Sequence, residues 1–281
     1  MATTPTKSHT KIRETTRART KVAVHKFSSC DGCQLGFLNL GEQLLALTEM
    51  VEISHFAEAG MLNEFLPVDI SFVEGSISTE KDIERIKAIR ESSGYVITIG
   101  ACATSGGLQA LRNMADADQW HQAIYAKPSF VKTLTTSTPI AEHIKVDFEL
   151  WGCPISTRQL LWTIRSLLFG ATPATETEKV CMECKRQGNI CVMVTKQIPC
   201  MGPVTKTGCG ALCPQFGRDC YGCFGPAKDV NTDSLSHTFT GFGLMPAEIK
   251  NRFHFINSHA DAFQKAGMNI EKKMDNEGSK A

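Results

Sequence analysis

The chain has 281 residues, 42% of them hydrophobic, which is enough for one large globular domain or two of ordinary size. Its 30 basic residues nearly balance 29 acidic ones, so no overall field draws the chain to nucleic acid or to a membrane surface. No stretch approaches the roughly 20 apolar residues that span a bilayer, and the basic first 20 residues lack the apolar run of a signal peptide. We therefore expect a cytoplasmic protein whose residues 1–20 form a flexible basic arm, or an arm that orders on a partner subunit.

Strand-like and helix-like runs alternate through the first 170 residues. Short β-branched or alternating runs predict strands at 21–27, 51–56, 68–73, 95–99 and 146–150. Apolar residues at helical spacing predict helices at 34–50, 79–90, 108–114 and 156–169. Ser78 or Thr79 is a suitable cap for the second of these helices. This alternation is typical of a parallel α/β sheet, on which ligands gather at the carboxyl ends of the strands.

Cysteines dominate the second half of the sequence. After a linker at 171–179, eight of the twelve cysteines fall in the 43 residues from Cys181 to Cys223, separated mainly by glycine, proline and polar or basic residues. We expect no core-forming helix or strand in this segment, so disulfides or metal must order it, and a cytoplasmic setting favours metal. Helices are predicted again at 246–257 and 260–274. The sequence thus divides into domains at 21–170 and 171–281.

The other four cysteines are Cys30, Cys33, Cys102 and Cys153, and all follow predicted strands. Because the carboxyl ends of parallel strands share one edge, we expect the four to converge in loops there, as a 4Fe–4S cluster requires. Nearby Gly32, Gly100 and Gly152 would allow tight turns and let backbone N–H groups approach the cluster sulfurs. Any one of these cysteines could instead be a small buried hydrophobic residue, but four together argue for a metal centre.

The eight clustered cysteines divide most simply, in chain order, into two further sets of four. The first set is Cys181, Cys184, Cys191 and Cys200, and the second is Cys209, Cys213, Cys220 and Cys223. Zinc also binds four cysteines, so a zinc-stabilised interaction protein without redox function remains an alternative. Zinc ribbons, however, usually pair two C-x2-C motifs, whereas Cys102 and Cys153 stand singly. Twelve cysteines make three sets of four with none left over.

Several motifs together resemble those of one family. They are CDGC at 30–33, VEGSI at 73–77, GACATSGG at 100–107, GCP at 152–154, PCMGPVT at 199–205 and CYGC at 220–223. Over residues 20–225 the chain is similar to the small, electron-transfer subunit of nickel–iron hydrogenases, and most similar to the soluble NAD(P)-linked or sulfhydrogenase delta type. The resemblance implies a flavodoxin-like domain followed by a smaller, loop- and helix-rich iron–sulfur domain.

The same resemblance implies three 4Fe–4S clusters. The proximal cluster would use Cys30, Cys33, Cys102 and Cys153, the distal one the set that begins at Cys181, and the medial one the set that begins at Cys209. Respiratory members of the family have a histidine where this chain has Cys181, and three medial cysteines where Cys213 here gives a fourth. Full thiolate ligation lowers reduction potentials. Glu74 would lie near the proximal cluster and the subunit interface, unless it is a solvated loop carboxylate.

The implied function is electron relay between the nickel–iron site of a large subunit and flavin/NAD(P)-binding and iron–sulfur diaphorase subunits. The alternatives are the small subunit of a deazaflavin-linked or disulfide-reductase-linked hydrogenase, and the related subunit of a quinone-reducing complex. The latter has adjacent cysteines in place of the CDGC motif and lacks the second domain. No cysteines remain for a nickel–iron site, so the chain alone is not catalytic. The eight histidines show no ligand spacing and are assigned structural or surface roles.

Overall fold

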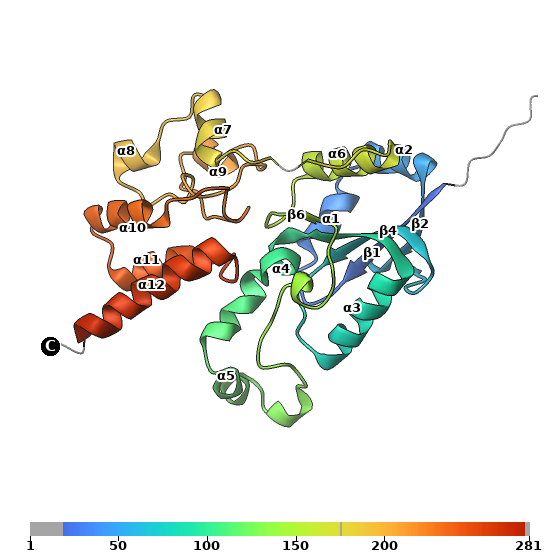
Figure 1. Ribbon diagram of the computed structural model, residues 1–281, viewed down its shortest axis with the longest axis horizontal. Helices are drawn as coiled ribbons and strands as arrows, with labels where there is room; N and C mark the ends of the chain where they lie inside the picture. The colour runs from blue at the N-terminus through green and yellow to red at the C-terminus, as the bar shows by residue number, and fades with distance from the viewer. Residues whose placement is uncertain (1–18, 175, 279–281) are drawn as a thin grey trace, which may run out of the picture.

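The computed structural model describes residues 19–174 and 176–278. The expected basic arm at 1–20 lies almost wholly outside this range, and only its last two residues are described: Arg19 donates a hydrogen bond to the Thr48 carbonyl, and Thr20 begins the first strand. A strand-containing half and a helical half lie side by side, the first running from blue to yellow-green and the second from yellow to red (Figure 1).

The first half is built on a six-stranded sheet in the order β3-β2-β1-β4-β5-β6. All neighbouring strands are parallel except β3, which is antiparallel to β2. The five parallel strands, counted in chain order, therefore lie in the order 2-1-3-4-5, which is the flavodoxin-like doubly wound arrangement. The strands are β1 (Thr20–Lys26), β2 (Val51–Phe56), β3 (Met61–Leu62), β4 (Val68–Glu74), β5 (Ser93–Ile99) and β6 (Phe148–Leu150). The predicted α/β fold is confirmed, and its order reverses between β1 and β4.

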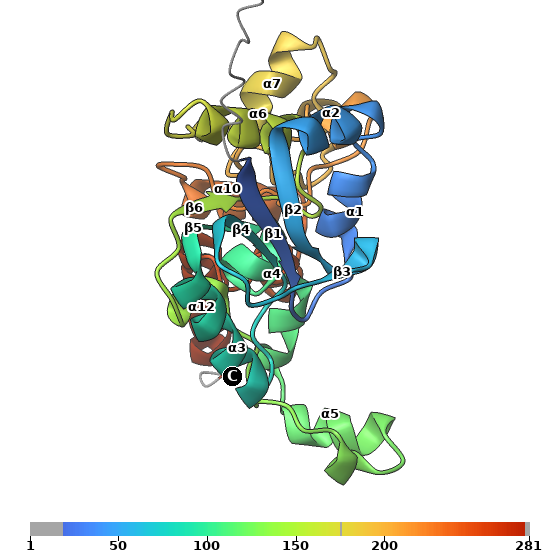
Figure 2. The same cartoon turned by 90° about the vertical axis from the view of Figure 1, so that its right-hand side faces the viewer.

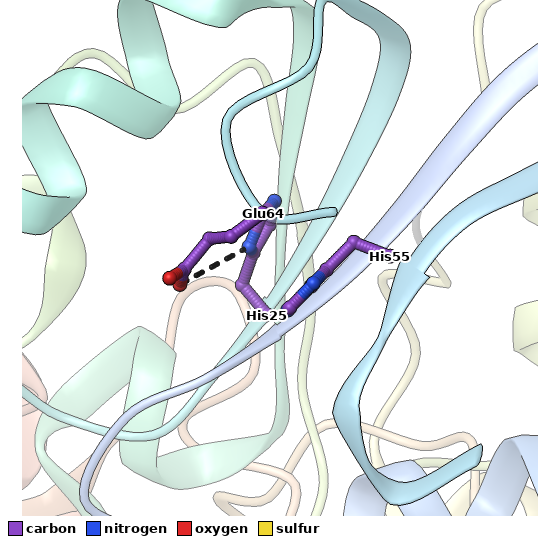
Figure 3. Close-up of side chains that lie close together, drawn as sticks. All are labelled: His25, His55 and Glu64. Carbon is purple, nitrogen blue, oxygen red and sulfur yellow. Dashed lines mark ion pairs between the residues drawn. The ribbon is translucent and has the colours of Figure 1, made fainter. Parts of the chain in front are cut away.

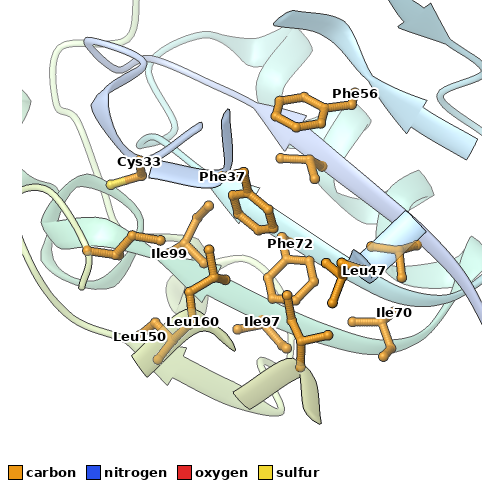
Figure 4. Close-up of a cluster of buried hydrophobic side chains, with 14 of the residues drawn as sticks. Cys33, Phe37, Leu47, Phe56, Ile70, Phe72, Ile97, Ile99, Leu150 and Leu160 are labelled. Carbon is orange, nitrogen blue, oxygen red and sulfur yellow. The ribbon is translucent and has the colours of Figure 1, made fainter. Parts of the chain in front are cut away.

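Helices cover both faces of the sheet. On one face α1 (Gly32–Leu38), α2 (Glu42–Met50) and α6 (Thr157–Leu168) pack over the alternate residues Val22, Val24, Ile70, Phe72, Ile97 and Ile99 (Figure 4). On the other face α3 (Glu80–Ser92) and α4 (Gly100–Ser105) cover Val73 and Val96. The excursion between β5 and β6 contains α5 (Ala117–Ile124), which stands away from the sheet at the bottom of both views (Figures 1 and 2). Four 3-10 helices complete this half, at Ala57–Ala59, Gly107–Met114, Pro128–Phe130 and Ile140–Glu142.

Local sequence explains where these helices begin and break. Thr79 is the cap of α3: its hydroxyl accepts from the Asp82 N–H at 3.1 Å, while the Asp82 carboxylate accepts from the Thr79 N–H at 2.9 Å. The single helix predicted at 34–50 is two helices, because the chain turns at Gly41, whose φ is +56°. Cys102, which was expected in a loop, lies in the short helix α4.

The second half contains six helices in the part of the chain that the structure describes. They are α7 (Val180–Arg186), α8 (Val192–Lys196), α9 (Leu212–Gln215), α10 (Thr232–Gly241), α11 (Pro246–His254) and α12 (Asp261–Gly278). Helix α10 was not predicted, and the expectation that the cysteine segment could form no helix or core was wrong. Its scattered apolar residues, such as Val180, Val192 and Met201, pack with Phe239 and Phe253 from the later helices. They are too far apart in sequence to show any periodicity.

A buried asparagine joins the two halves. Asn257, which is 1% exposed, accepts a hydrogen bond from Ser105 Oγ at 2.7 Å and donates one from Nδ2 to the Gly222 carbonyl at 2.7 Å. Ser105 ends α4 in the strand half, and Gly222 belongs to the cysteine segment. The Lys206 ammonium of the second half also lies 4.4 Å from the ring centre of Trp151 in the first. These contacts hold the cysteine segment against the carboxyl edge of the sheet.

Candidate metal centres

The first four cysteines meet at the carboxyl edge of the sheet. Cys30 lies in the turn after β1 and Cys153 in the turn after β6, but Cys33 and Cys102 lie in the short helices α1 and α4 rather than in the expected loops. Burial raises the pKa of Cys102 to about 12, with further contributions from Cys153 and Cys30. Burial likewise raises the pKa of Cys33, and the nearby thiols of Cys102 and Cys153 raise it further. The four thiols thus lie in one another's electrostatic range.

Glycine backbone, at Gly100 and Gly107, lies directly against this group of sulfurs. Gly100 has a φ of +86°, and a Cβ there would overlap the sulfur of Cys33. A Cβ at Gly107 would lie 2.7 Å from Cys102 Sγ. The Ala101 N–H donates to the Gly152 carbonyl at 2.7 Å and so joins the turns that follow β5 and β6. Glycine is required here because the backbone approaches sulfur too closely for a side chain.

Glu74 supports the same group from the end of β4. Its carboxylate accepts hydrogen bonds from the N–H groups of Cys33 at 3.0 Å and Gln34 at 3.2 Å, in the first turn of α1. Only 2% of Glu74 is exposed, so it is not a solvated loop carboxylate. Burial raises its pKa, and the two backbone hydrogen bonds oppose that shift. Glu74 therefore fixes the main chain that carries Cys33.

The second group of cysteines surrounds α7 and α8. Cys181 and Cys184 lie in α7, Cys191 immediately precedes α8, and Cys200 follows it. Burial raises the pKa of Cys181 to about 11, and Cys200, Cys184 and Cys191 add to the shift. A Cβ at Gly202 would lie 3.3 Å from Cys181 Sγ and 3.4 Å from Cys200 Sγ. The four thiols again share one site, with main chain close to the sulfurs.

The third group lies between the other two. Burial raises the pKa of Cys223 to about 12, and Cys209, Cys153 and Cys213 add to that shift. Cys153, which belongs to the first group, therefore lies within electrostatic range of the Cys223 thiol. Burial raises the pKa of Cys220, and the nearby thiols of Cys200 and Cys223 raise it further. The backbone N–H of Cys220 donates a hydrogen bond to Cys200 Sγ at 3.1 Å. The third group thus lies near the first through Cys223 and Cys153, and one hydrogen bond connects it to the second.

The chemistry of the three groups fits an iron–sulfur cluster better than a single zinc ion. All twelve cysteines are free thiols, and burial makes unpaired thiolates costly, so metal must compensate their charge. Tetrahedral zinc with Zn–S bonds near 2.3 Å would bring its sulfurs within about 3.8 Å of one another. Among residues 19–174 and 176–278, no three cysteines have sulfurs that all lie within 4.8 Å. Their wider spacing leaves room for a cluster.

Comparison with known proteins identifies the family. Residues 30–167 match the family described as NADH ubiquinone oxidoreductase, 20 Kd subunit. The chain is 34% identical to sulfhydrogenase 2 subunit delta of Pyrococcus furiosus, over 76% of this chain and 90% of that relative. The chain belongs to the family of nickel–iron hydrogenase small subunits. This small subunit is also 31% identical to a subunit of the F420-non-reducing hydrogenase of Methanocaldococcus jannaschii, over 84% of its own length and 93% of the relative.

A solved structure agrees with this family. The protein described here matches one chain of an NAD+-reducing NiFe-hydrogenase in the H2-reduced state. The TM-score is 0.52 and the sequence identity is 25%, over 56% of this chain and 94% of that one. The chain is therefore a subunit of a hydrogenase, an iron–sulfur oxidoreductase, which excludes the non-redox alternative. Within its described residues, no helix is long and apolar enough to cross a membrane.

The sequence patterns did not reveal one further group in the small subunit. His25, His55 and Glu64 have ligand atoms that all lie within 4.8 Å of one another. The two histidines are 30 positions apart on different strands, so no local spacing links them. The available signal was that the strands predicted at 21–27 and 51–56 each carry a histidine next to or near their carboxyl ends.

Proposed function

We propose that this chain is a cytoplasmic electron-transfer subunit that connects the nickel–iron site of a large subunit to an acceptor subunit through three 4Fe–4S clusters. Cys30, Cys33, Cys102 and Cys153 would hold the proximal cluster, Cys209, Cys213, Cys220 and Cys223 the medial one, and Cys181, Cys184, Cys191 and Cys200 the distal one. When bound, each cluster supplies a one-electron redox centre. The observation that carries the proposal is the continuous series of three cysteine groups.

The chain's own residues would set the order and the environment of that series. The electrostatic proximity of Cys223 to Cys153 supports a medial group next to the proximal one, and the Cys220 N–H bonded to Cys200 sulfur supports a medial group next to the distal one. Backbone N–H groups that point at sulfur stabilise added negative charge, and burial opposes it. Glu74 would hold the main chain of Cys33 so that the proximal ligands keep their positions.

Two acceptors are compatible with this proposal. Full thiolate ligation favours low potentials, which suits flavin/NAD(P)-binding and iron–sulfur diaphorase subunits. The acceptor of an F420-non-reducing hydrogenase is the second candidate, because the relative from that type of enzyme matches 84% of this chain, whereas the NAD+-reducing structure matches 56%. Hydrogen-dependent reduction of NAD(P)+ by the purified complex is expected only for the first candidate.

Metal analysis of anaerobically purified protein tests the cluster number. We expect about 12 iron and 12 sulfide per chain and no stoichiometric zinc in the cysteine sites. Four iron would leave only one cluster in place. Zinc at the cysteines without iron would contradict the relay.

The same analysis of Cys213→Ser tests the medial assignment. Loss of one thiolate is expected to convert the medial cluster to a three-iron form, lowering the iron content to about 11 per chain and adding an EPR signal in the oxidised protein. The proximal and distal clusters should stay reducible and serve as internal controls. An unchanged spectrum would remove Cys213 from the ligand set.

A further inference from the structure

His25, His55 and Glu64 form a compact group of side chains (Figure 3). His25 comes from β1, His55 from β2, and Glu64 from the connection between β3 and β4. The two imidazole rings are stacked with centroids 4.8 Å apart and an angle of 22° between their planes. His25 Nδ1 lies 3.9 Å from a Glu64 oxygen. Within the described residues, no other set of three histidine, cysteine or acidic side chains is so compact.

Strand pairing brings the two histidines together. β1 and β2 are parallel neighbours, and His55 lies opposite Ala23 in their register. Since side chains alternate along a strand, Ala23 and His25 share one face of β1, while Val22 and Val24 belong to the core on the other face. The short antiparallel β3 then returns the chain so that Glu64 reaches the same place. The sheet therefore fixes the two histidines, and the connection between β3 and β4 supplies Glu64.

Three of the four ring nitrogens of His25 and His55 lack a hydrogen-bond partner in the protein. His25 is 1% exposed and His55 is 3% exposed. His25 Nδ1 and both nitrogens of His55 have no hydrogen-bond partner, whereas His25 Nε2 lies 3.4 Å from Ser71 Oγ. Buried polar atoms without partners are destabilising, so a bound ion or an ordered water must satisfy them. Burial also lowers the pKa of His25 to about 3 and lowers that of His55, so both rings are neutral and can offer a lone pair to a metal.

The surrounding charges can accept a cation. Arg85 pairs with Glu64 and also donates to the Lys26 carbonyl at 2.5 Å, so it orients the carboxylate. The Lys26 ammonium is itself paired with Asp31 at 2.6 Å and Glu58 at 3.0 Å. These three carboxylates and two cations leave one excess negative charge, although Arg85 also acts on both histidines and opposes a second cation beside them.

We propose that His25 Nδ1, one ring nitrogen of His55 and the Glu64 carboxylate bind one divalent ion of the zinc class. Two imidazoles and a carboxylate are a donor set that zinc accepts, with water in the fourth position. The ion would tie β2 and the β3–β4 connection to β1, just ahead of the turn that carries Cys30. The proposal does not depend on the clusters or on the electron acceptor.

The experiment measures zinc in anaerobically purified, cluster-loaded protein after dialysis against buffered free Zn2+. We expect one zinc per chain in addition to an unchanged iron content. X-ray absorption at the zinc edge should show nitrogen and oxygen ligands at about 2.0–2.1 Å. Zinc with sulfur ligands near 2.3 Å would mean occupation of a cysteine site and would overturn the proposal. No zinc above background would assign the group to ordered water and would overturn it equally.

Two variants identify the ligands. Glu64→Gln and His55→Gln should weaken zinc binding by at least about 10-fold, while iron content and circular dichroism stay as in the unaltered protein. His143→Gln is the matched control, because this half-buried histidine bonds to Thr138 Oγ1 at 2.7 Å, away from the group. Equal zinc affinity in all three variants would overturn the assignment. If a variant fails to fold, the X-ray absorption spectrum of the unaltered protein still shows whether zinc has nitrogen and oxygen ligands or sulfur ligands.

Discussion

A Gly100→Ala variant is expected to lose the proximal cluster. The added Cβ would overlap the sulfur of Cys33, and Gly100 has a φ of +86°, which costs any other residue about 1–2 kcal/mol. The backbone cannot retreat, because the neighbouring Ala101 N–H is bonded to the Gly152 carbonyl. Iron should fall from about 12 to about 8 per chain, and hydrogen-dependent electron transfer by the assembled complex should fall to background.

Gly243→Ala is the matched control for this variant. Gly243 has a φ of +88°, but no atom lies within 4 Å of the position that its Cβ would take. The backbone cost is therefore the same, without a contact to sulfur. The control should be slightly less stable and should keep its full iron content and activity. If Gly100→Ala also kept about 12 iron per chain, the sulfur of Cys33 could not lie as close to Gly100 as the structure shows.

Anaerobic removal of iron is expected to unfold the cysteine segment from Cys181 to Cys223 and leave the strand half folded. The helices α7, α8 and α9 have seven, five and four residues, which is too short for independent stability. Without clusters the segment keeps only a few apolar anchors, such as Val192 and Met201, against α10–α12. Bound clusters would therefore supply a large part of the folding free energy of this segment.

Limited trypsin digestion measures this effect. Cleavage in iron-free protein should appear at the basic residues of the segment, which are Lys185, Arg186, Lys196, Lys206 and Arg218. Lys81 and Lys87 are exposed on α3 in the strand half and serve as internal controls that should stay uncut in both forms. Equal resistance of the cysteine segment with and without iron would show that its apolar anchors suffice.

The five parallel strands were predictable because each one is a short apolar run bounded by a turn, whereas the two-residue strand β3 was not predicted. Val68–Glu74 and Val51–Phe56 appear within one residue of their predicted ranges, since β-branched residues and alternation are local signals. The order of the parallel strands was predicted from the family resemblance, because the sequence of one strand does not show which strands pair with it. The division of the helix predicted at 34–50 depended on Gly41, whose presence the sequence shows but whose positive φ it does not.

The remaining features were missed because they depend on contacts between distant parts of the chain. α10 has serines and threonines at many positions, and only the burial of Leu235 and Phe239 against later helices makes it stable. The proximity of Cys223 to Cys153, like that of His25 to His55, requires the packed fold. The number of cysteines predicted sets of four ligands. Which cysteines lie together depends on the tertiary structure, which the sequence pattern does not show.

The position of Asn257 has a consequence for biosynthesis. Its hydrogen bonds to Ser105 and Gly222 join the two halves, yet it follows all twelve cysteines in the chain. During translation the strand half and the whole cysteine segment leave the ribosome before this residue can close the junction. The junction between the two halves is therefore completed only after every cysteine has left the ribosome, when Asn257 forms its two hydrogen bonds.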